Sequence, residues 1–216
     1  MKQWIADHLI ADPREQTTAA TDLALAGAAL MAIQRLRGAT GWRRRIWQAA
    51  FALLAASGVL GAIVHGLRLS PSTRERLWQP LNVLLALIIA LFATAAVSDR
   101  WGERTGQRVL LALALAAPGF AWLSRRLQRG FLAFIIYELV AMVSALAIYA
   151  DLARRRQLPG ANHITLGILV TIAAAGIQTS SLEVVIGEIP FDHNGLFHLV
   201  QLAALPLLVE GVWKSL

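Results

Sequence analysis

Two long stretches without a charged side chain most constrain what this chain can fold into. Residues 46–67 and 79–98 contain no Asp, Glu, Lys or Arg. Each is long enough to cross the hydrocarbon of a bilayer as a helix, which takes roughly 17–25 apolar residues. Over the whole chain 57% of residues are hydrophobic and 15% are charged, against about 25% charged in a soluble domain. The sequence therefore predicts an integral membrane protein.

Seven segments are predicted to cross the membrane: 17–37, 46–67, 79–98, 107–124, 130–150, 162–182 and 194–213. All are expected to be helices, because a barrel would need a series of alternating ten-residue segments that this chain lacks. The predicted fold is all-α, a polytopic seven-transmembrane helix bundle. Residues 17–216 form its single domain, and residues 1–16 form an N-terminal tail or an interfacial helix.

The distribution of Lys and Arg predicts the orientation of the bundle. The connection after the first segment is rich in Arg, whereas the connection after the sixth segment has no basic residue. We therefore expect the N-terminus outside and the C-terminus in the cytoplasm, in a bacterial inner membrane. The net charge of +7 is explained by basic residues that flank the spans. Membrane lipids and other membrane subunits are the expected partners, and nucleic acid is not.

Several polar side chains are predicted to lie at the same depth, in the outer third of the bundle. Ionisable side chains inside a membrane are costly and mark functional sites by default. The six residues in this group come from five segments: Asp22, His65, Glu138, Gln178, His193 and His198.

Three histidines in this group could bind a metal, since neutral imidazoles suit zinc. His65, His193 and His198 are the candidate ligands. His193 and His198 would lie about 140° apart on one continuous helix, so a shared metal favours a helix break at Asn194-Gly195. Each histidine also has a structural alternative, such as a contact at a helix end, where Asp192 or Asn194 would provide the cap.

Three further side chains are candidates for catalysis. Glu138 and Asp22 could transfer protons, and Ser57 lies about two turns below His65 on roughly the same face. Buried carboxyl groups and small polar residues also link helices without any chemical role. The chain has no cysteine, which excludes disulfides and thiolate metal sites.

Two short stretches resemble a known family. Gly61-Ala62-Ile63-Val64-His65-Gly66 and residues 191–201 are similar to the second-span and seventh-span motifs of the superfamily of alkaline ceramidases and progestin/adipoQ-type receptors. The resemblance implies a zinc-dependent amide hydrolase of membrane lipids, with His65, His193 and His198 as zinc ligands.

The chain also departs from the pattern of that superfamily. Gly61 stands where the superfamily has Ser, the seventh-span histidines are five residues apart and not four, and the superfamily's Asp has no clear match. Glu75 and Asn82 are the nearest polar residues to that position.

Three functions stay open from the sequence. The first is a zinc-dependent intramembrane hydrolase of a lipid amide or ester. The second is a non-catalytic seven-helix protein, either a receptor or an accessory subunit of a larger membrane complex. The third is a haem-binding membrane protein with His65 and His198 as axial ligands. A microbial rhodopsin is disfavoured because the last span has no lysine at mid-membrane.

Overall fold

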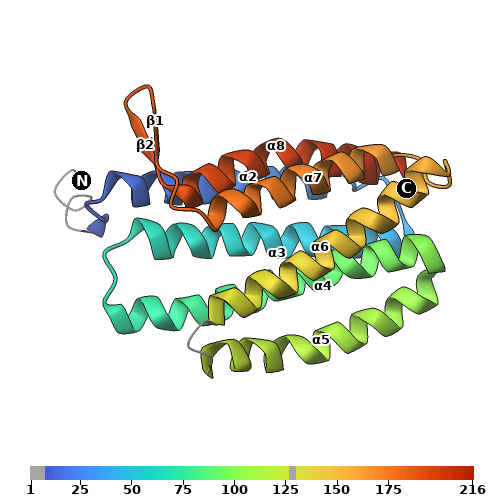
Figure 1. Cartoon of the computed structure of the whole chain (residues 1–216), viewed down its shortest axis with the longest axis horizontal. Helices are drawn as coiled ribbons and strands as arrows, with labels where there is room; N and C mark the ends of the chain where they lie inside the picture. The colour runs from blue at the N-terminus through green and yellow to red at the C-terminus, as the bar shows by residue number, and fades with distance from the viewer. Residues whose placement is uncertain (1–7, 127–129) are drawn as a thin grey trace.

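The computed structural model describes residues 8–126 and 130–216 and is almost entirely helical (Figure 1). Seven long helices and one short hairpin make up the described part of the chain. The helices are α2 (Pro13–Arg35), α3 (Gly41–Gly66), α4 (Pro71–Trp101), α5 (Glu103–Arg126), α6 (Gly130–Arg154), α7 (Ala161–Gln178) and α8 (His193–Lys214). Each of the seven predicted segments thus coincides with a helix.

Five of these helices are long and apolar enough to cross a membrane: α3, α4, α6, α7 and α8. The other two are more polar. α2 carries Arg14, Glu15 and Asp22 within its first ten residues, and α5 has charged residues in its first and last turns. Five helices of this length and composition among the described residues indicate a membrane protein.

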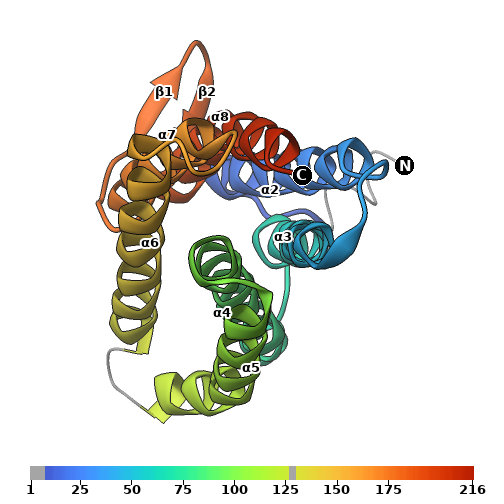
Figure 2. The same cartoon turned by 90° about the vertical axis from the view of Figure 1, so that its right-hand side faces the viewer.

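Six helices surround a common interior, as the end-on view shows (Figure 2). In order around the ring they are α2, α3, α4, α6, α7 and α8, and each contacts the next. α5 lies outside this ring against α4. Successive helices run in opposite directions, so the connections gather at two ends of the bundle.

A β-hairpin marks one of these ends. Strands β1 (Val184–Ile186) and β2 (Ile189–Phe191) pair antiparallel, and Gly187 at the turn has φ 65°. We call this the hairpin end, and the opposite one the C-terminal end. The prediction that the sixth span reaches residue 182 is wrong, because α7 stops at Gln178. The hydroxyls of Thr179 and Ser180 bond to carbonyls of the last turn and end the helix there.

Capping residues set where three helices begin. Asp12 accepts a hydrogen bond from the Arg14 N–H at the start of α2, and Ser70 accepts from the Thr73 N–H at the start of α4. A proline follows each of these caps, where its missing N–H costs nothing. At α8 the cap is Asp192, as one of the structural alternatives predicted.

Glycines allow two pairs of helices to approach closely. A Cβ on Gly58 would lie 2.6 Å from the carbonyl oxygen of Asp22, so α3 and α2 can touch only without that side chain. A Cβ on Gly211 would lie 2.6 Å from the side chain of Ile164, where α8 meets α7. Close backbone approach through small residues is typical of helices packed in membranes.

A buried polar cluster holds the C-terminal end together. Asp99 of α4 accepts hydrogen bonds at one oxygen from the guanidinium of Arg43 on α3, at 2.6 Å, and from the hydroxyl of Tyr149 on α6, at 2.7 Å. Arg43 also donates to the carbonyl oxygen of Ser215, just beyond α8. This cluster joins three helices through one carboxylate, and Arg43 extends it to the residue that follows α8; it was not predicted from the sequence.

We predict that Gly211→Ala destabilises the bundle. The added methyl group would meet Ile164 and the backbone of Gly160, and overpacking of this kind costs about 1–3 kcal/mol. The midpoint of thermal unfolding in detergent should fall. Gly27→Ala is the matched control, because a Cβ at this helical glycine meets nothing within 4 Å. Equal melting points for the two variants would contradict the close packing of α7 and α8.

Candidate functional site: a polar cavity inside the helix ring

The ring encloses a cavity of about 580 Å³. All six ring helices contribute to its wall, and none of the described side chains of α5 does. The polar side chains that line it are Asp22, Ser57, His65, Asn82, Glu138, Thr171, Gln178, Asn194, His198 and Gln201.

The cavity changes from polar to apolar along its length. At the hairpin end its wall on α3 carries His65 and Ser57, and further along the same helix it carries Phe51 and Trp47. His65 and Trp47 are eighteen residues apart, which is about 27 Å along a helix. On α8 the same order holds, from His198 and Gln201 to Leu205 and Leu208. Such a cavity matches an amphiphile whose polar group lies at the hairpin end.

His198 and Asp22 form the most deeply buried polar pair of the cavity wall. The Nε2 atom of His198 lies 3.4 Å from Oδ1 of Asp22, and both side chains are buried. At the other nitrogen of the imidazole, Nδ1 of His198 lies 3.0 Å from the hydroxyl of Thr21. Thr21 in turn donates to the carbonyl oxygen of Thr18, at 2.9 Å.

These contacts determine how many protons the pair carries. The single hydroxyl proton of Thr21 is used on the Thr18 carbonyl, so Nδ1 of His198 must be a donor. If neither Nε2 of His198 nor the facing oxygen of Asp22 carried a proton, their lone pairs would face each other and repel. A further proton therefore lies between them. The pair is then neutral overall, either as two neutral groups or as an ion pair. An unpaired charge in an apolar interior, by contrast, is costly.

One oxygen of this pair has no partner within the described residues. Oδ2 of Asp22 is buried and has no hydrogen-bond partner among the described residues. Gly61 makes room for the carboxyl group, because a Cβ there would lie 2.7 Å from both of its oxygens. The glycine that departs from the superfamily's serine is therefore required by the position of Asp22.

His65 forms a second pair at the hairpin end of the cavity. Its Nδ1 atom lies 2.7 Å from Oε2 of Glu15 on α2, and the edge of its ring meets Trp78 of α4 at right angles, with the ring centroids 5.7 Å apart. His65 is also within electrostatic range of Asp22 and His198. Two carboxyl–imidazole pairs thus lie next to each other between α2, α3 and α8.

The structure brings most of the predicted site residues together. Five of the six residues predicted at one depth line this cavity, namely Asp22, His65, Glu138, Gln178 and His198. Ser57 also lines it, although its hydroxyl donates to the carbonyl oxygen of Leu54. The sixth residue, His193, is not part of the lining.

The expected helix break at Asn194-Gly195 is absent. α8 is continuous from His193, because Asp192 caps it and accepts a hydrogen bond from the Gly195 N–H. His193 therefore points away from His198, as the angle on a continuous helix requires. Among the described residues, no group of three or more His, Asp or Glu side chains is placed to hold a metal ion. The three histidines thus do not form a zinc site in this arrangement, and zinc binding stays a prediction.

Sequence reasoning missed four residues that shape the site: Glu15, Thr21, Trp78 and Gln201. Glu15 was assigned to the tail before the first span, whereas α2 already begins at Pro13. Thr171 donates to Oε1 of Gln201, which leaves the Gln201 amide nitrogen as a donor inside the cavity. Thr21 and Gln201 could have been found from their position in the sequence, since each lies within three residues of a predicted site residue.

Comparison with protein families shows to which family the chain belongs. A family model matches residues 17–216 and carries the description "Family of unknown function (DUF6962)". The chain belongs to the DUF6962 family. The matched range covers every residue that lines the cavity. No curated protein and no solved structure gave a match. The resemblance to the ceramidase superfamily therefore stays a prediction for this DUF6962 member.

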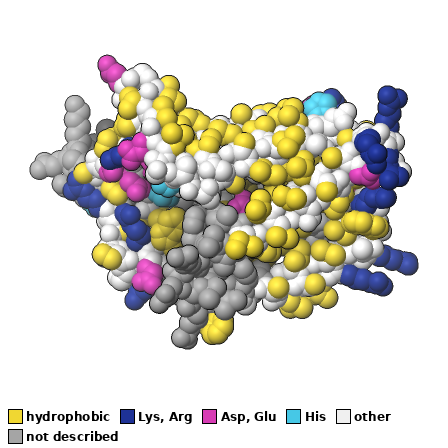
Figure 3. Space-filling model, in the orientation of Figure 1, with side chains coloured by type: hydrophobic (Ala, Val, Ile, Leu, Met, Phe, Trp, Pro, Cys, Tyr) yellow, Lys and Arg dark blue, Asp and Glu magenta, His cyan; other side chains and the backbone are white. Residues whose placement is uncertain are grey.

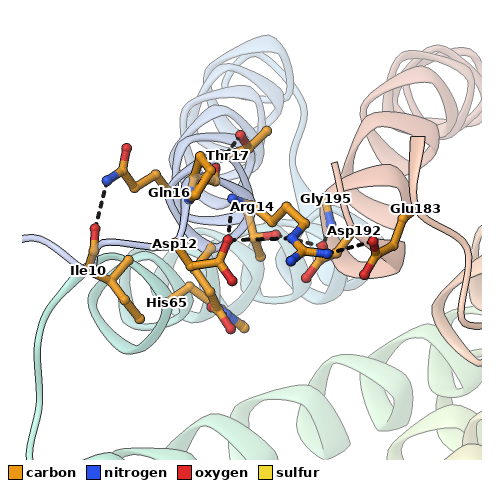
Figure 4. Close-up of polar contacts among 12 residues, drawn as sticks. Ile10, Asp12, Arg14, Gln16, Thr17, His65, Glu183, Asp192 and Gly195 are labelled. Atoms are coloured by element: carbon orange, nitrogen blue, oxygen red, sulfur yellow. Dashed lines mark hydrogen bonds and ion pairs between the residues drawn. The ribbon is translucent and has the colours of Figure 1, made fainter. Parts of the chain in front are cut away.

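Asp192 connects the start of α8 to α2 at the edge of the cavity. One of its oxygens accepts from the Thr18 hydroxyl at 2.9 Å and from the Gly195 N–H at 2.8 Å. Nearby, Arg14 bridges Asp12 and Glu183, so the base of the hairpin is also held to α2 (Figure 4). Partial burial raises the pKa of Asp192, but the hydrogen bonds from Gly195 and Thr18 outweigh it, and the net pKa is lowered.

We predict that Asp192 makes the stability of the protein depend on pH. A carboxyl group with a lowered pKa in the folded state stabilises the protein above its unfolded pKa of about 3.9. That contribution is lost as the pH falls below this value. Asp192→Asn keeps a capping side chain but cannot ionise. The melting point of the wild type should exceed that of the variant at pH 7, and the difference should shrink towards pH 3. A difference that does not change with pH would contradict this assignment.

Proposed function

We propose that this protein is an intramembrane hydrolase that cleaves an ester or amide bond of a lipid held in the cavity of the helix ring. The observation that carries the proposal is the position of the neutral His198–Asp22 pair in the polar half of a cavity whose other half is apolar. A lipid with its acyl chain against Phe51 and Leu205 would place its polar linkage near this pair.

The residues of the pair can move the protons that hydrolysis requires. Water adds to the carbonyl carbon, and the bond from that carbon to the leaving oxygen or nitrogen breaks. The proton held between His198 and Asp22 passes to the leaving atom, and the pair regains a proton from the attacking water. The products are a carboxylic acid and an alcohol or amine. The amide nitrogen of Gln201 is a suitable donor to the negative charge that develops on the carbonyl oxygen.

Glu138 and the His65–Glu15 pair have supporting roles in this proposal. Glu138 lies on α6, across the cavity from α2, where it can bind a polar or cationic group of the lipid. His65 and Glu15 lie at the hairpin end of the cavity and can hold water next to the reaction site. Zinc bound by His65, His193 and His198, and haem bound by His65 and His198, stay predictions on which this mechanism does not depend.

The proposed membrane topology has seven spans. We propose that α2 and α5 cross the membrane together with the five apolar helices. α2 is part of the helix ring and α5 packs against α4, and both run antiparallel to the helices they contact along the chain. The hairpin end would lie outside and the C-terminal end in the cytoplasm of a bacterial inner membrane. In Figure 3 the C-terminal end of the molecule is rich in Lys and Arg and the hairpin end carries more acidic side chains, in accord with the positive-inside rule.

A second candidate is a receptor or accessory subunit that holds a lipid without cleaving it. The observation that favours it is that His198 is bonded to Thr21 within a continuous set of contacts, from Asp192 through Thr18, that ties α8 to α2. In this reading the pair fastens two helices, and a ligand in the cavity changes how tightly they are held.

We predict that His198→Asn lowers hydrolysis by about 10²–10⁴-fold, the usual contribution of a general acid–base group. Asparagine can still donate to Thr21, but it cannot exchange a proton with Asp22. The purified protein would be incubated with N-acyl sphingoid bases, monoacylglycerols and lysophospholipids, and release of fatty acid measured by mass spectrometry.

His193→Asn is the matched control, because it removes a histidine from the same helix outside the cavity lining. Full activity in this control and loss in His198→Asn would support the proposal. Loss of activity and of bound zinc in both variants would favour the three-histidine zinc site. If the wild type retains lipid from the membrane but cleaves none of the panel, the second candidate is correct.

A further inference from the structure

The hairpin between α7 and α8 exposes an unusual amount of apolar surface. Val185, Ile186 and Ile189 are 66%, 52% and 54% exposed, and Leu182 before the hairpin is 46% exposed. In the register of the two strands, Val184 pairs with Phe191, Val185 with Pro190 and Ile186 with Ile189. Every pair is apolar, so both faces of the hairpin are apolar.

Such a hairpin is poorly suited to water. A lone two-stranded hairpin is marginally stable there, and this one has only three residues in each strand. Its strands also leave outward-facing backbone groups without a neighbouring strand. An apolar environment around these side chains would remove the free-energy cost of exposing them to water.

The base of the hairpin is fixed to the bundle. Phe191 is buried and lies against Gly195 of α8. Glu183 just before β1 forms an ion pair with Arg14 of α2, at 2.5 Å. Asp192 directly after β2 is bonded to Thr18. The direction in which the hairpin projects is therefore set by these contacts.

That direction is sideways from the bundle. In both cartoon views the hairpin leaves the ring next to α7 and α8 and points away from α4 and α5 (Figures 1 and 2). It lies at the ends of the helices and runs across their long axes. When the helices cross a membrane, the hairpin consequently lies along the membrane surface.

The apolar surface of the hairpin continues into the lipid-facing belt of the bundle. In the space-filling view, hydrophobic side chains run from the hairpin onto the helices beside it (Figure 3). On α7, the helix that precedes the hairpin, Leu166 and Leu169 are exposed. Residues 182–191 contain no Lys or Arg, so anionic headgroups would not attract the hairpin. Contact with the membrane would come from apolar side chains.

We propose that residues 182–191 form an interfacial membrane anchor that lies in the leaflet at the hairpin end and inserts Val185, Ile186 and Ile189 between lipid headgroups and acyl chains. The anchor holds Asp192, and with it the start of α8 and the polar end of the cavity, at the level of the headgroups. This inference requires that the bundle crosses a membrane, but it does not depend on hydrolysis.

The absence of cysteine allows a direct test by site-directed spin labelling. Single variants Val185→Cys and Ile189→Cys would be labelled with a nitroxide in the full-length chain, which is then reconstituted into phosphatidylcholine vesicles. Power saturation would compare collisions with oxygen, which concentrates in lipid, and with a water-soluble nickel chelate. Leu169→Cys on α7 is the lipid-facing control, and Gly38→Cys, in the turn after α2, is the water-facing control.

We expect both hairpin labels to collide more with oxygen than with nickel, as the Leu169 label does, and unlike the Gly38 label. A label at Glu188→Cys, in the turn, should collide more with nickel than the two strand labels. Hairpin labels that behave like the Gly38 label would show a hairpin in water and overturn the proposal. Labels immobilised and shielded from both reagents would also overturn it, because they would indicate contact with a second copy or a protein partner.

The three strand positions chosen for labels, Val185, Ile186 and Ile189, give independent readings, so the test does not depend on one variant. Ile186→Cys would replace either strand label if that variant fails to fold, as judged by its thermal unfolding. An oxygen preference at two of the three positions supports the anchor, and a nickel preference at two of them overturns it.

Discussion

Polar groups inside a membrane must find partners within the protein, and this requirement organises the whole bundle. Two buried polar clusters provide most of these partners. At the C-terminal end, Asp99 accepts from both Arg43 and Tyr149 and joins three helices through one carboxylate. At the hairpin end, contacts from Asp192 through Thr18 and Thr21 reach His198 and tie α8 to α2. Between these clusters the helices are held by apolar packing and by glycines that allow close approach.

The cluster at the hairpin end differs from the other because it borders a cavity. Each cluster keeps one buried polar atom without a partner among the described residues, Nε of Arg43 in the first and Oδ2 of Asp22 in the second, but only Asp22 lines the cavity. The same contacts that fasten α2 to α8 also set the proton on the His198–Asp22 pair. In the proposed hydrolase, structural and chemical roles would therefore fall on the same side chains, and a substitution at His198 must be judged by stability as well as by activity.

The positions of the helices, and the depth of polar side chains along them, can be predicted from the sequence. Long apolar segments locate five of the helices, because the cost of unpaired backbone groups leaves few other structures for them. The more polar segments 17–37 and 107–124 also coincide with helices, α2 and α5. Counting residues from the span ends places Asp22, His65, Glu138, Gln178 and His198 at one level, and these five line one cavity. The same counting includes His193, which is at that level but outside the cavity lining. Depth follows from position along a helix, whereas the direction of a side chain depends on how the helix is rotated.

Sequence alone thus establishes the helical membrane character of the chain, the basic C-terminal end and the level of the polar groups, because these depend on composition along each helix. It does not reveal that Glu15 pairs with His65, that Thr21 orients His198, or that Arg43 and Tyr149 meet at Asp99. These contacts join residues 50 or more positions apart. They exist only once the helices are rotated and packed in the ring, so the tertiary arrangement decides which polar groups become partners and which of them line the cavity.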